Sequence, residues 1–173
     1  MRRQILERPG PATARPLHLS DIDRLEPAEG EIIIDVAACG VCRTDLQLVE
    51  GELTARVLPV VPGHQVVGRV AHVGSGGAGW AVGERAGVAW LAGACGSCEY
   101  CRSGRENLCA DAAFAGWSFN GGYAEQIAVR SDFALRIPRL FSDVEAAPLL
   151  CGGIIGYRAL KISGIEPGGR LGL

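Results

Sequence analysis

Four of the seven cysteines fall within one short stretch, CGSCEYCRSGRENLC. The spacing is C-x2-C-x2-C-x7-C, supplied by Cys95, Cys98, Cys101 and Cys109. Four thiolates on one loop can complete a tetrahedron around Zn²⁺, and a zinc with four protein ligands is structural. An iron–sulfur cluster is the alternative, although the ferredoxin run has three residues before its last cysteine and a proline after it. This chain has seven residues there and Ala110 afterwards, which favours zinc.

A second set of metal-binding side chains is scattered along the chain. It comprises Cys42 in GVCRTD, His64 in VPGHQVVG and Cys151 in PLLCGGIIGYRAL. Two thiolates and a neutral imidazole balance the charge of Zn²⁺ and leave its fourth position open to water or substrate. That arrangement is typical of a catalytic zinc. Isolated Cys and His residues are also common in protein cores, so from the residues alone both interpretations stand.

Cys39 lies three residues before Cys42, and CGVC could be a redox C-x-x-C pair. No thioredoxin-like βαβ pattern surrounds it. We therefore expect Cys39 to be a small buried residue. His18 and His72 are expected to be ordinary surface or strand residues.

These candidate ligands must be positioned by a mainly β framework. Strand-like segments span 31–38, 66–73, 84–91 and 123–138, separated by turns rich in glycine and proline. The pattern predicts a mostly antiparallel, barrel-like domain. The segment GSGGAG (74–79) fits G-x-G-x-x-G, but WAVGERAGV follows it and leads into another strand instead of a helix. We predict a hairpin connection there.

Two helical segments are predicted. The first is CRTDLQLVE (42–50), which places Cys42 at its start. The second runs over 142–162, with Ser142 as N-cap and Glu145 at the capping-box position. Three glycines are expected to interrupt it, at 152, 153 and 156.

Length and composition limit the function classes. A chain of 173 residues with 48% hydrophobic and 21% charged residues is a globular domain of ordinary size. Its apolar runs are too short to cross a membrane. The net charge of −2, without a Lys or Arg run, argues against nucleic-acid binding. The odd cysteine number argues against a disulfide framework, and the start lacks a secretory apolar region, so we expect a cytoplasmic protein.

Taken together, the motifs resemble the zinc-dependent alcohol dehydrogenases of the medium-chain dehydrogenase/reductase superfamily. The similarity runs through CGVCRTDL, PGHQVVG, the four-cysteine stretch, GGYAEQ and APLLCGG, in the order found in that family. It implies a mostly β fold with a few helices, a GroES-like β-barrel catalytic domain over 1–160 with a structural-zinc lobe over about 92–112. Residues 161–173 would begin a Rossmann cofactor domain that is absent from this chain.

The resemblance also implies an activity. Such an enzyme interconverts a small alcohol and an aldehyde or ketone: the alcohol binds the zinc held by Cys42, His64 and Cys151, loses its proton and passes a hydride to NAD or NADP. Two Zn²⁺ per chain are implied, and a homo-oligomer is implied for a full-length enzyme. Without a cofactor domain, the isolated chain is expected to be inactive. The alternative is a natural stand-alone zinc module with a structural or binding role.

Four further residues receive roles through the resemblance alone. Thr44 would take the proton of the substrate hydroxyl, and Asp45 would hold the zinc-bound His64. Arg43 would contact the cofactor pyrophosphate, and Trp90 would lie near the substrate pocket. Thr44 and Asp45 are also ordinary first-turn helix residues, and Arg43 could equally be a solvated surface charge.

Overall fold

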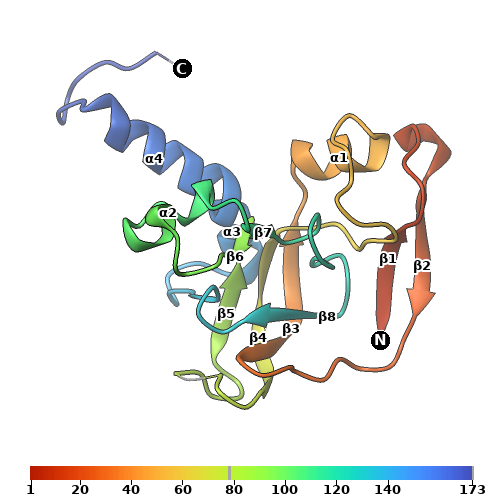
Figure 1. Ribbon diagram of the computed structural model, residues 1–173. Helices are drawn as coiled ribbons and strands as arrows, with labels where there is room; N and C mark the ends of the chain where they lie inside the picture. Colours follow the sequence, from red (N-terminus) through yellow and green to blue (C-terminus); the bar gives the residue numbers. More distant parts are fainter. Residues whose placement is uncertain (78, 173) are drawn as a thin grey trace.

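The computed structural model describes residues 1–77 and 79–172, which are arranged around one antiparallel sheet (Figure 1). The sheet has five strands in the order β8-β3-β4-β5-β9. Their bounds are β3 Glu31–Gly40, β4 Gln65–Val73, β5 Arg85–Val88, β8 Gln126–Arg130 and β9 Leu135–Arg136. The prediction of a mostly antiparallel β domain is confirmed.

Both faces of the central strands are covered. Three consecutive residues of β3, Ile32–Ile34, are fully buried, which occurs where neither face of a strand meets solvent. On one face, Ile32 and Ile34 belong to the main core. On the other, Val67 of β4 packs against Ala146 and its neighbours in helix α3 (Asp143–Pro148). The sheet is therefore a rigid layer on which the candidate ligands are mounted.

The N-terminal segment forms two strands that the sequence pattern does not reveal. β1 (Arg2–Leu6) pairs with β2 (Leu17–Asp21), and a 3₁₀ turn, Ala12–Ala14, lies between them. His18 lies in β2 and His72 in β4, as expected of ordinary strand residues. β1 is held by partners that are distant in sequence, including a bridge from Leu6 to Val60. A local hydrophobic period therefore does not predict this strand.

Two predicted strands are each divided in the structure. The segment 84–91 yields β5, and then the chain turns before β6 (Leu91–Gly93). The segment 123–138 yields β8 and the short β9, separated by a turn in which the Phe133 amide donates to the Arg130 carbonyl. Ala89 at the first turn and Phe133 and Ala134 at the second still pack inward, and these apolar residues hid the breaks. The connection 74–79 joins antiparallel β4 and β5 as predicted, except that Ala78 lies outside the described residues.

A small subdomain contains the four-cysteine stretch. β6 pairs with β7 (Ala113–Phe114), and between them lie α2 (Glu99–Arg102) and a 3₁₀ turn, Glu106–Leu108. Its own core consists of Ala94, Cys109 and Ala112. These three residues form a cluster of their own, whereas Ala92 of β6 packs in the main core and ties the subdomain to the sheet.

Most of the predicted helices form. α1 (Arg43–Glu50) begins directly after Cys42. The second helical segment comprises α3, a π-helical turn at Leu149–Gly153 and α4 (Ile154–Ser163). The expected glycine interruption is therefore wrong in detail. Gly152 and Gly153 widen the helix into a π turn instead of ending it, and Gly156 lies inside α4.

The capping box of α3 supplies a pH-dependent prediction. Ser142 Oγ accepts from the Glu145 amide, and Glu145 Oε2 accepts from the Ser142 amide at 2.9 Å and from the Ser142 hydroxyl at 2.7 Å. These hydrogen bonds from Ser142 lower the pKa of Glu145. Because its folded pKa is depressed, the ionised side chain stabilises the fold above the unfolded value of about 4.3, and this contribution disappears as pH falls through the folded pKa.

Glu145→Gln is therefore expected to lower the midpoint of thermal unfolding at pH 7 by a few degrees at most. At about pH 3 the two proteins should unfold together, since protonated glutamate and glutamine are nearly equivalent. Thermal melts followed by circular dichroism at both pH values measure this. A difference that persists unchanged at low pH would contradict the assignment.

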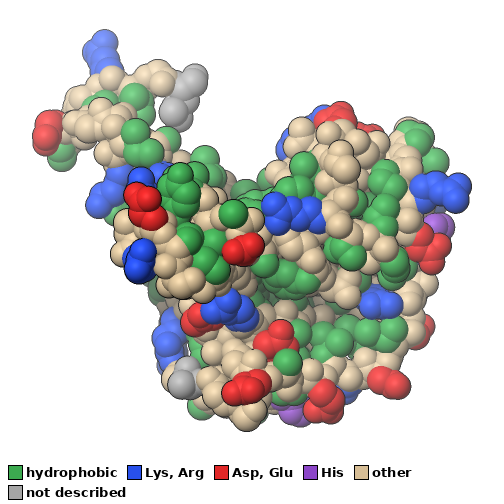
Figure 2. Space-filling model, in the orientation of Figure 1, with side chains coloured by type: hydrophobic (Ala, Val, Ile, Leu, Met, Phe, Trp, Pro, Cys, Tyr) green, Lys and Arg blue, Asp and Glu red, His purple; other side chains and the backbone are tan. Residues whose placement is uncertain are grey.

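Helix α4 projects away from the sheets and leads to the C-terminal end of the chain (Figures 1 and 2). Its exposed apolar side chains are Ile154, Ile155, Tyr157, Leu160 and Ile162. The suggested domain boundary after residue 160 falls inside α4. Residues 164–172 form neither helix nor strand. No helix among the described residues is long and apolar enough to cross a membrane.

Candidate metal centres

The four lobe cysteines converge on one point. Their sulfur atoms all lie within 4.8 Å of one another. Cys101 Sγ is 3.5 Å from Cys98 Sγ and 3.8 Å from Cys95 Sγ. Two sulfurs each about 2.3 Å from a tetrahedral zinc would be about 3.8 Å apart, so the donors fit this ion.

Backbone amides in the lobe donate hydrogen bonds to cysteine sulfur atoms, which favours the thiolate form. α2 begins after Cys98, whose Sγ accepts from the Cys101 amide, and Cys95 Sγ accepts from the Cys98 amide at 3.4 Å. Hydrogen bonds from the backbone of Ser97 and Cys98 lower the pKa of Cys95 to about 6. Burial and the neighbouring Cys98 raise the pKa of Cys101 to about 12. The backbone of the lobe therefore favours a thiolate at Cys95.

The second group brings together three distant segments. Cys42 precedes α1, His64 precedes β4 and Cys151 lies in the π turn before α4. Their ligand atoms lie within 4.8 Å of one another, and the two sulfurs are 3.8 Å apart, again the separation that tetrahedral zinc requires. His64 is only 1% exposed. The structure thus assembles the three residues that the sequence singled out, and three ligands leave one zinc position open.

Asp45 fixes this group from behind. Its side chain is 5% exposed, and its Oδ1 lies 3.0 Å from His64 Nδ1. Oδ1 also accepts from the Gly63 amide at 3.1 Å, and Oδ2 accepts from the Cys42 amide at 2.9 Å. The carboxylate therefore orients the imidazole and ties together the backbone at two ligand positions. Burial would lower the pKa of His64, but the hydrogen bond and charge of Asp45 outweigh it, and the pKa is raised.

Gly63 is needed for this approach. Its φ is +98°, a conformation that side chains other than glycine rarely adopt. A Cβ there would also lie 2.6 Å from the ring of Tyr123. The glycine lets the chain turn tightly beside Asp45, so that His64 enters the site at the start of β4.

The two thiols of this group differ. Burial would raise the pKa of Cys42, but hydrogen bonds from the Thr44 backbone and side chain outweigh it and lower the value. Burial and the adjacent Cys42 raise the pKa of Cys151 to about 11. Thr44 Oγ1 lies 3.8 Å from Cys42 Sγ. The threonine hydroxyl therefore lies beside one thiol of the three-ligand group.

Arg43 and Trp90 occupy different surroundings. Arg43 is exposed and paired with Glu52, its Nη2 lying 2.8 Å from Oε2. The ring of Trp90 meets that of His64 edge-on, with centroids 4.9 Å apart. Trp90 thus adjoins the metal-ligand group, whereas Arg43 faces solvent at the start of α1.

The aromatic partners of Trp90 were not predicted from the sequence. Its ring stacks on Phe114 at 5.1 Å and on Trp117 at 5.7 Å. Arg56 covers Trp117 with its guanidinium 4.3 Å from the ring centroid and donates to the Ala112 carbonyl. The aromatic-rich loop FAGWSF (114–119) was the available signal, but nothing local indicated that it folds back onto Trp90.

Cys39 belongs to neither group. It is half-buried against the main core, and burial raises its pKa to about 12. A thiol with that pKa stays protonated at neutral pH, unlike a reactive redox cysteine. The expectation that Cys39 is a small packing residue agrees with this environment.

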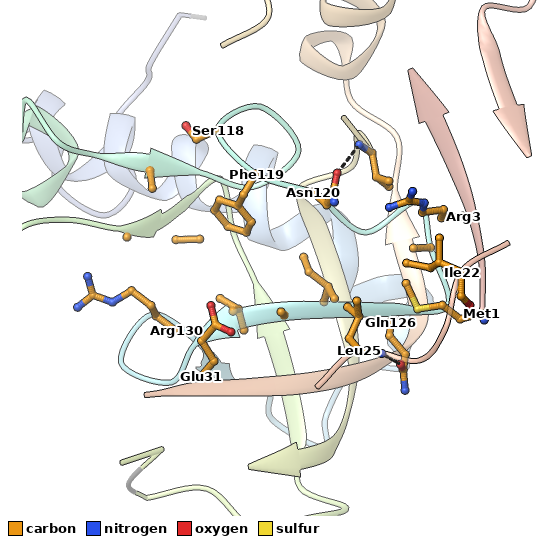
Figure 3. Close-up of a pocket in the computed structure, with 18 of the residues that line it drawn as sticks. Met1, Arg3, Ile22, Leu25, Glu31, Ser118, Phe119, Asn120, Gln126 and Arg130 are labelled. Atoms are coloured by element: carbon orange, nitrogen blue, oxygen red, sulfur yellow. Dashed lines mark hydrogen bonds between the residues drawn. The ribbon is translucent and has the colours of Figure 1, made fainter. Parts of the chain in front are cut away.

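A separate pocket of about 640 Å³ runs beside strand β8 (Figure 3). Met1, Arg3 and Gln126 lie toward one end of it, and Glu31 and Arg130 toward the other. Cys42, His64 and Cys151 do not line it. This pocket is therefore not the opening to the three-ligand group.

Comparison with known proteins identifies the family. Residues 28–139 match the model of the alcohol dehydrogenase GroES-like domain. The chain is 49% identical to a probable alcohol dehydrogenase, AdhA, of Mycobacterium tuberculosis, over 97% of this chain and 50% of that protein.

Solved structures agree. A cobalt- and zinc-bound thermostable alcohol dehydrogenase from Pyrobaculum aerophilum superposes with a TM-score of 0.87 at 29% identity, over 97% of this chain and 50% of that one. CAD from Helicobacter pylori, complexed with NADP(H), gives 0.83 at 25% identity, over 98% and 52%. The chain spans about half the length of these relatives. It belongs to the GroES-like domain family of the zinc-dependent alcohol dehydrogenases.

Proposed function

We propose that this chain is the zinc-binding catalytic part of an enzyme that interconverts small alcohols with aldehydes or ketones, using NAD or NADP. The observation that carries the proposal is the Cys42–His64–Cys151 group with Asp45 behind it, a three-ligand site whose donors have the spacing of tetrahedral zinc. The alcohol dehydrogenase relatives and the zinc-bound structural neighbour support it. Cys95, Cys98, Cys101 and Cys109 would hold a second, structural zinc.

The residues around the open position have distinct proposed roles. Zinc bound there would act as a Lewis acid toward the alcohol oxygen. Thr44 would accept the substrate hydroxyl's proton at Oγ1 and pass it outward. Asp45 holds the imidazole of His64 in one orientation. Trp90, stacked on Phe114 and Trp117, would contact the apolar part of the alcohol and keep water away.

The coenzyme requires protein beyond these residues. The one segment that fits a dinucleotide fingerprint, 74–79, joins two antiparallel strands instead of opening a helix. We propose that residues 161–173 lead into a Rossmann domain and that the apolar side chains of α4 pack against it. Arg43, once released from Glu52, would contact the coenzyme pyrophosphate. On its own, this chain would bind zinc without turning over alcohol.

The free cysteines also support a proposal for the cellular compartment of the enzyme. Seven free thiols, with none of the described cysteines in a disulfide, suit a reducing compartment, and we propose the cytoplasm. We also propose a homo-oligomer for the complete enzyme, acting on small molecules and not on nucleic acid or membranes.

Native mass spectrometry of the purified chain tests the metal assignment. We expect two Zn²⁺ per chain, and one in Cys42→Ser, because the three-ligand group loses a thiolate while the lobe is untouched. Cys39→Ala is the matched control and should retain both ions. One zinc in the parent protein, or equal loss in both variants, would contradict the proposal.

Cobalt substitution tests the open position directly. A Co²⁺ ion at the three-ligand site should change its visible absorption when benzyl alcohol is added, because the alcohol can enter the fourth position. Cys42→Ser should abolish this change. An unaltered spectrum at saturating alcohol would indicate a closed site and a structural role.

A further inference from the structure

A basic cleft lies on the sheet away from both cysteine groups. It has a volume of about 960 Å³ and is formed by the start of β5, the segment 136–143 and one residue of β4. The charged residues that line it are Arg69, Arg85, Arg136, Arg139, Glu84 and Asp143. Four guanidinium groups and two carboxylates leave this arginine cleft with a charge of +2, although the whole chain carries −2.

Two of these arginines lie side by side on neighbouring strands of the sheet. Arg69 of β4 and Arg85 of β5 are directly paired in the antiparallel register, so their side chains emerge on the same face. Like charges in this position destabilise a sheet. Asp143 compensates Arg85 through a 2.7 Å contact. Arg69 donates to the Gly83 carbonyl and is paired in register with Asp35 of β3, but it forms no ion pair with any of the described residues. A bound anion would supply a further negative partner beside the two guanidinium groups.

The cleft also has an exposed guanidinium group without an ion-pair partner. That group is not Arg85, which is 14% exposed: its Nε and Nη1 bind Asp143 and the Pro138 carbonyl, and its Nη2 is buried away from the cleft surface. Arg139 is exposed and forms no ion pair within the part of the chain that the structure describes. Guanidinium groups bind phosphate oxygens through paired, charge-assisted hydrogen bonds.

Apolar residues line the same cleft. Val82, Ile137 and Phe141 all contribute, and Phe141 is 37% exposed. The volume is within the range of about 300–1,000 Å³ that small-molecule sites occupy. A phosphate monoester carries a charge of about −1.5 to −2 at pH 7, which matches the lining. Its organic part would lie against Phe141.

The cleft is distant from the proposed catalytic centre. His64 immediately precedes β4, and Arg69 lies five residues further along the same strand. At about 3.3 Å per residue, their backbones are about 16 Å apart. We propose that the arginine cleft is a second binding site, which takes a small phosphate monoester with an apolar body. This site is independent of the proposed dehydrogenase activity.

NMR titration of the zinc-loaded, ¹⁵N-labelled chain with phenyl phosphate tests this proposal. We expect saturable shifts at amides of residues 69, 82–85 and 136–143, and an affinity that falls as salt is raised. Arg139→Gln should weaken binding about tenfold, because it removes a charged donor without disturbing packing. Arg8→Gln is the control: Arg8 is exposed and lies outside the cleft, and this variant should bind as the parent does.

Arg69→Gln gives a second test. It should also weaken phenyl phosphate binding, because it removes another exposed guanidinium group from the cleft lining. Three results would overturn the proposal: no saturable shift in the cleft at millimolar phenyl phosphate, equal weakening by Arg139→Gln and Arg8→Gln, or cleft binding of benzyl alcohol as tight as that of the phosphate ester.

Discussion

Replacing Cys101 by serine is expected to remove one zinc from the chain and to unfold the small subdomain around it. Cys101 Sγ lies within 4 Å of two other lobe sulfurs, so its loss leaves three ligands and no closed tetrahedron. Structural zinc contributes on the order of 10 kcal/mol to the folding of small peptides, and less where an independent core exists.

The effect should be large but local. Among the described residues, the cluster inside the lobe has three buried members, Ala94, Cys109 and Ala112, whereas the main core on the sheet has ten. We therefore expect hydrogen exchange to lose protection across residues 94–113 while β3 and β4 stay protected, with a fall of about 10 °C in the thermal midpoint.

Cys39→Ala serves as the comparison for Cys101→Ser, because it removes a thiol that belongs to neither group. It should retain two zinc ions and normal exchange in the lobe. If Cys101→Ser kept two zinc ions, or if the main sheet lost protection as early as the lobe, the assignment of a separate structural zinc would be wrong.

Asp45→Asn is expected to have the largest effect on the three-ligand group without altering any proposed ligand. The substitution preserves shape, but an amide cannot accept from His64 Nδ1, the Gly63 amide and the Cys42 amide together. The NH₂ group of the new amide would then face one of these buried N–H groups, so that two hydrogen-bond donors oppose each other. Loss of such a supporting partner typically lowers metal affinity by about 10- to 100-fold.

Competition with a chelator, followed by zinc release from each site, measures this change. The lobe zinc should keep its affinity, since Asp45 contacts none of its ligands. Asp35→Asn is the matched control: Asp35 is exposed and binds Arg24 and Gln126, away from the metal ligands. Equal affinities in Asp45→Asn and the parent protein would show that Asp45 is only a helix-start residue.

The features that could be predicted from the sequence are those that local spacing encodes. The lobe ligands lie within fifteen residues, so their convergence needs little more than a turn of helix and a loop. The Ser142–Glu145 capping box likewise depends on neighbours three residues apart and forms as predicted. The central strand β3 could be predicted over 31–38 from its apolar run.

Other elements could not be predicted because their partners are distant in sequence. β1 is held by β2, by Val60 and by residues 123–125, all distant from it in sequence. The breaks within 84–91 and 123–138 were hidden because the residues at the turns still pack inward. The aromatic cluster on Trp90 needs Arg56 and the loop 114–119 to meet, and no periodicity predicts this meeting.

By itself, the sequence determined which residue types are available for metal binding, and through its motifs it determined the family. Tertiary structure decided that Cys42, His64 and Cys151, separated by up to 109 residues, share one point, and that Asp45 lies behind them. It also decided that Arg69 and Arg85 lie side by side on the neighbouring strands β4 and β5. The physical reason is the same in each case: strand register and helix placement depend on burial over the whole fold, and only that placement turns separate side chains into a site.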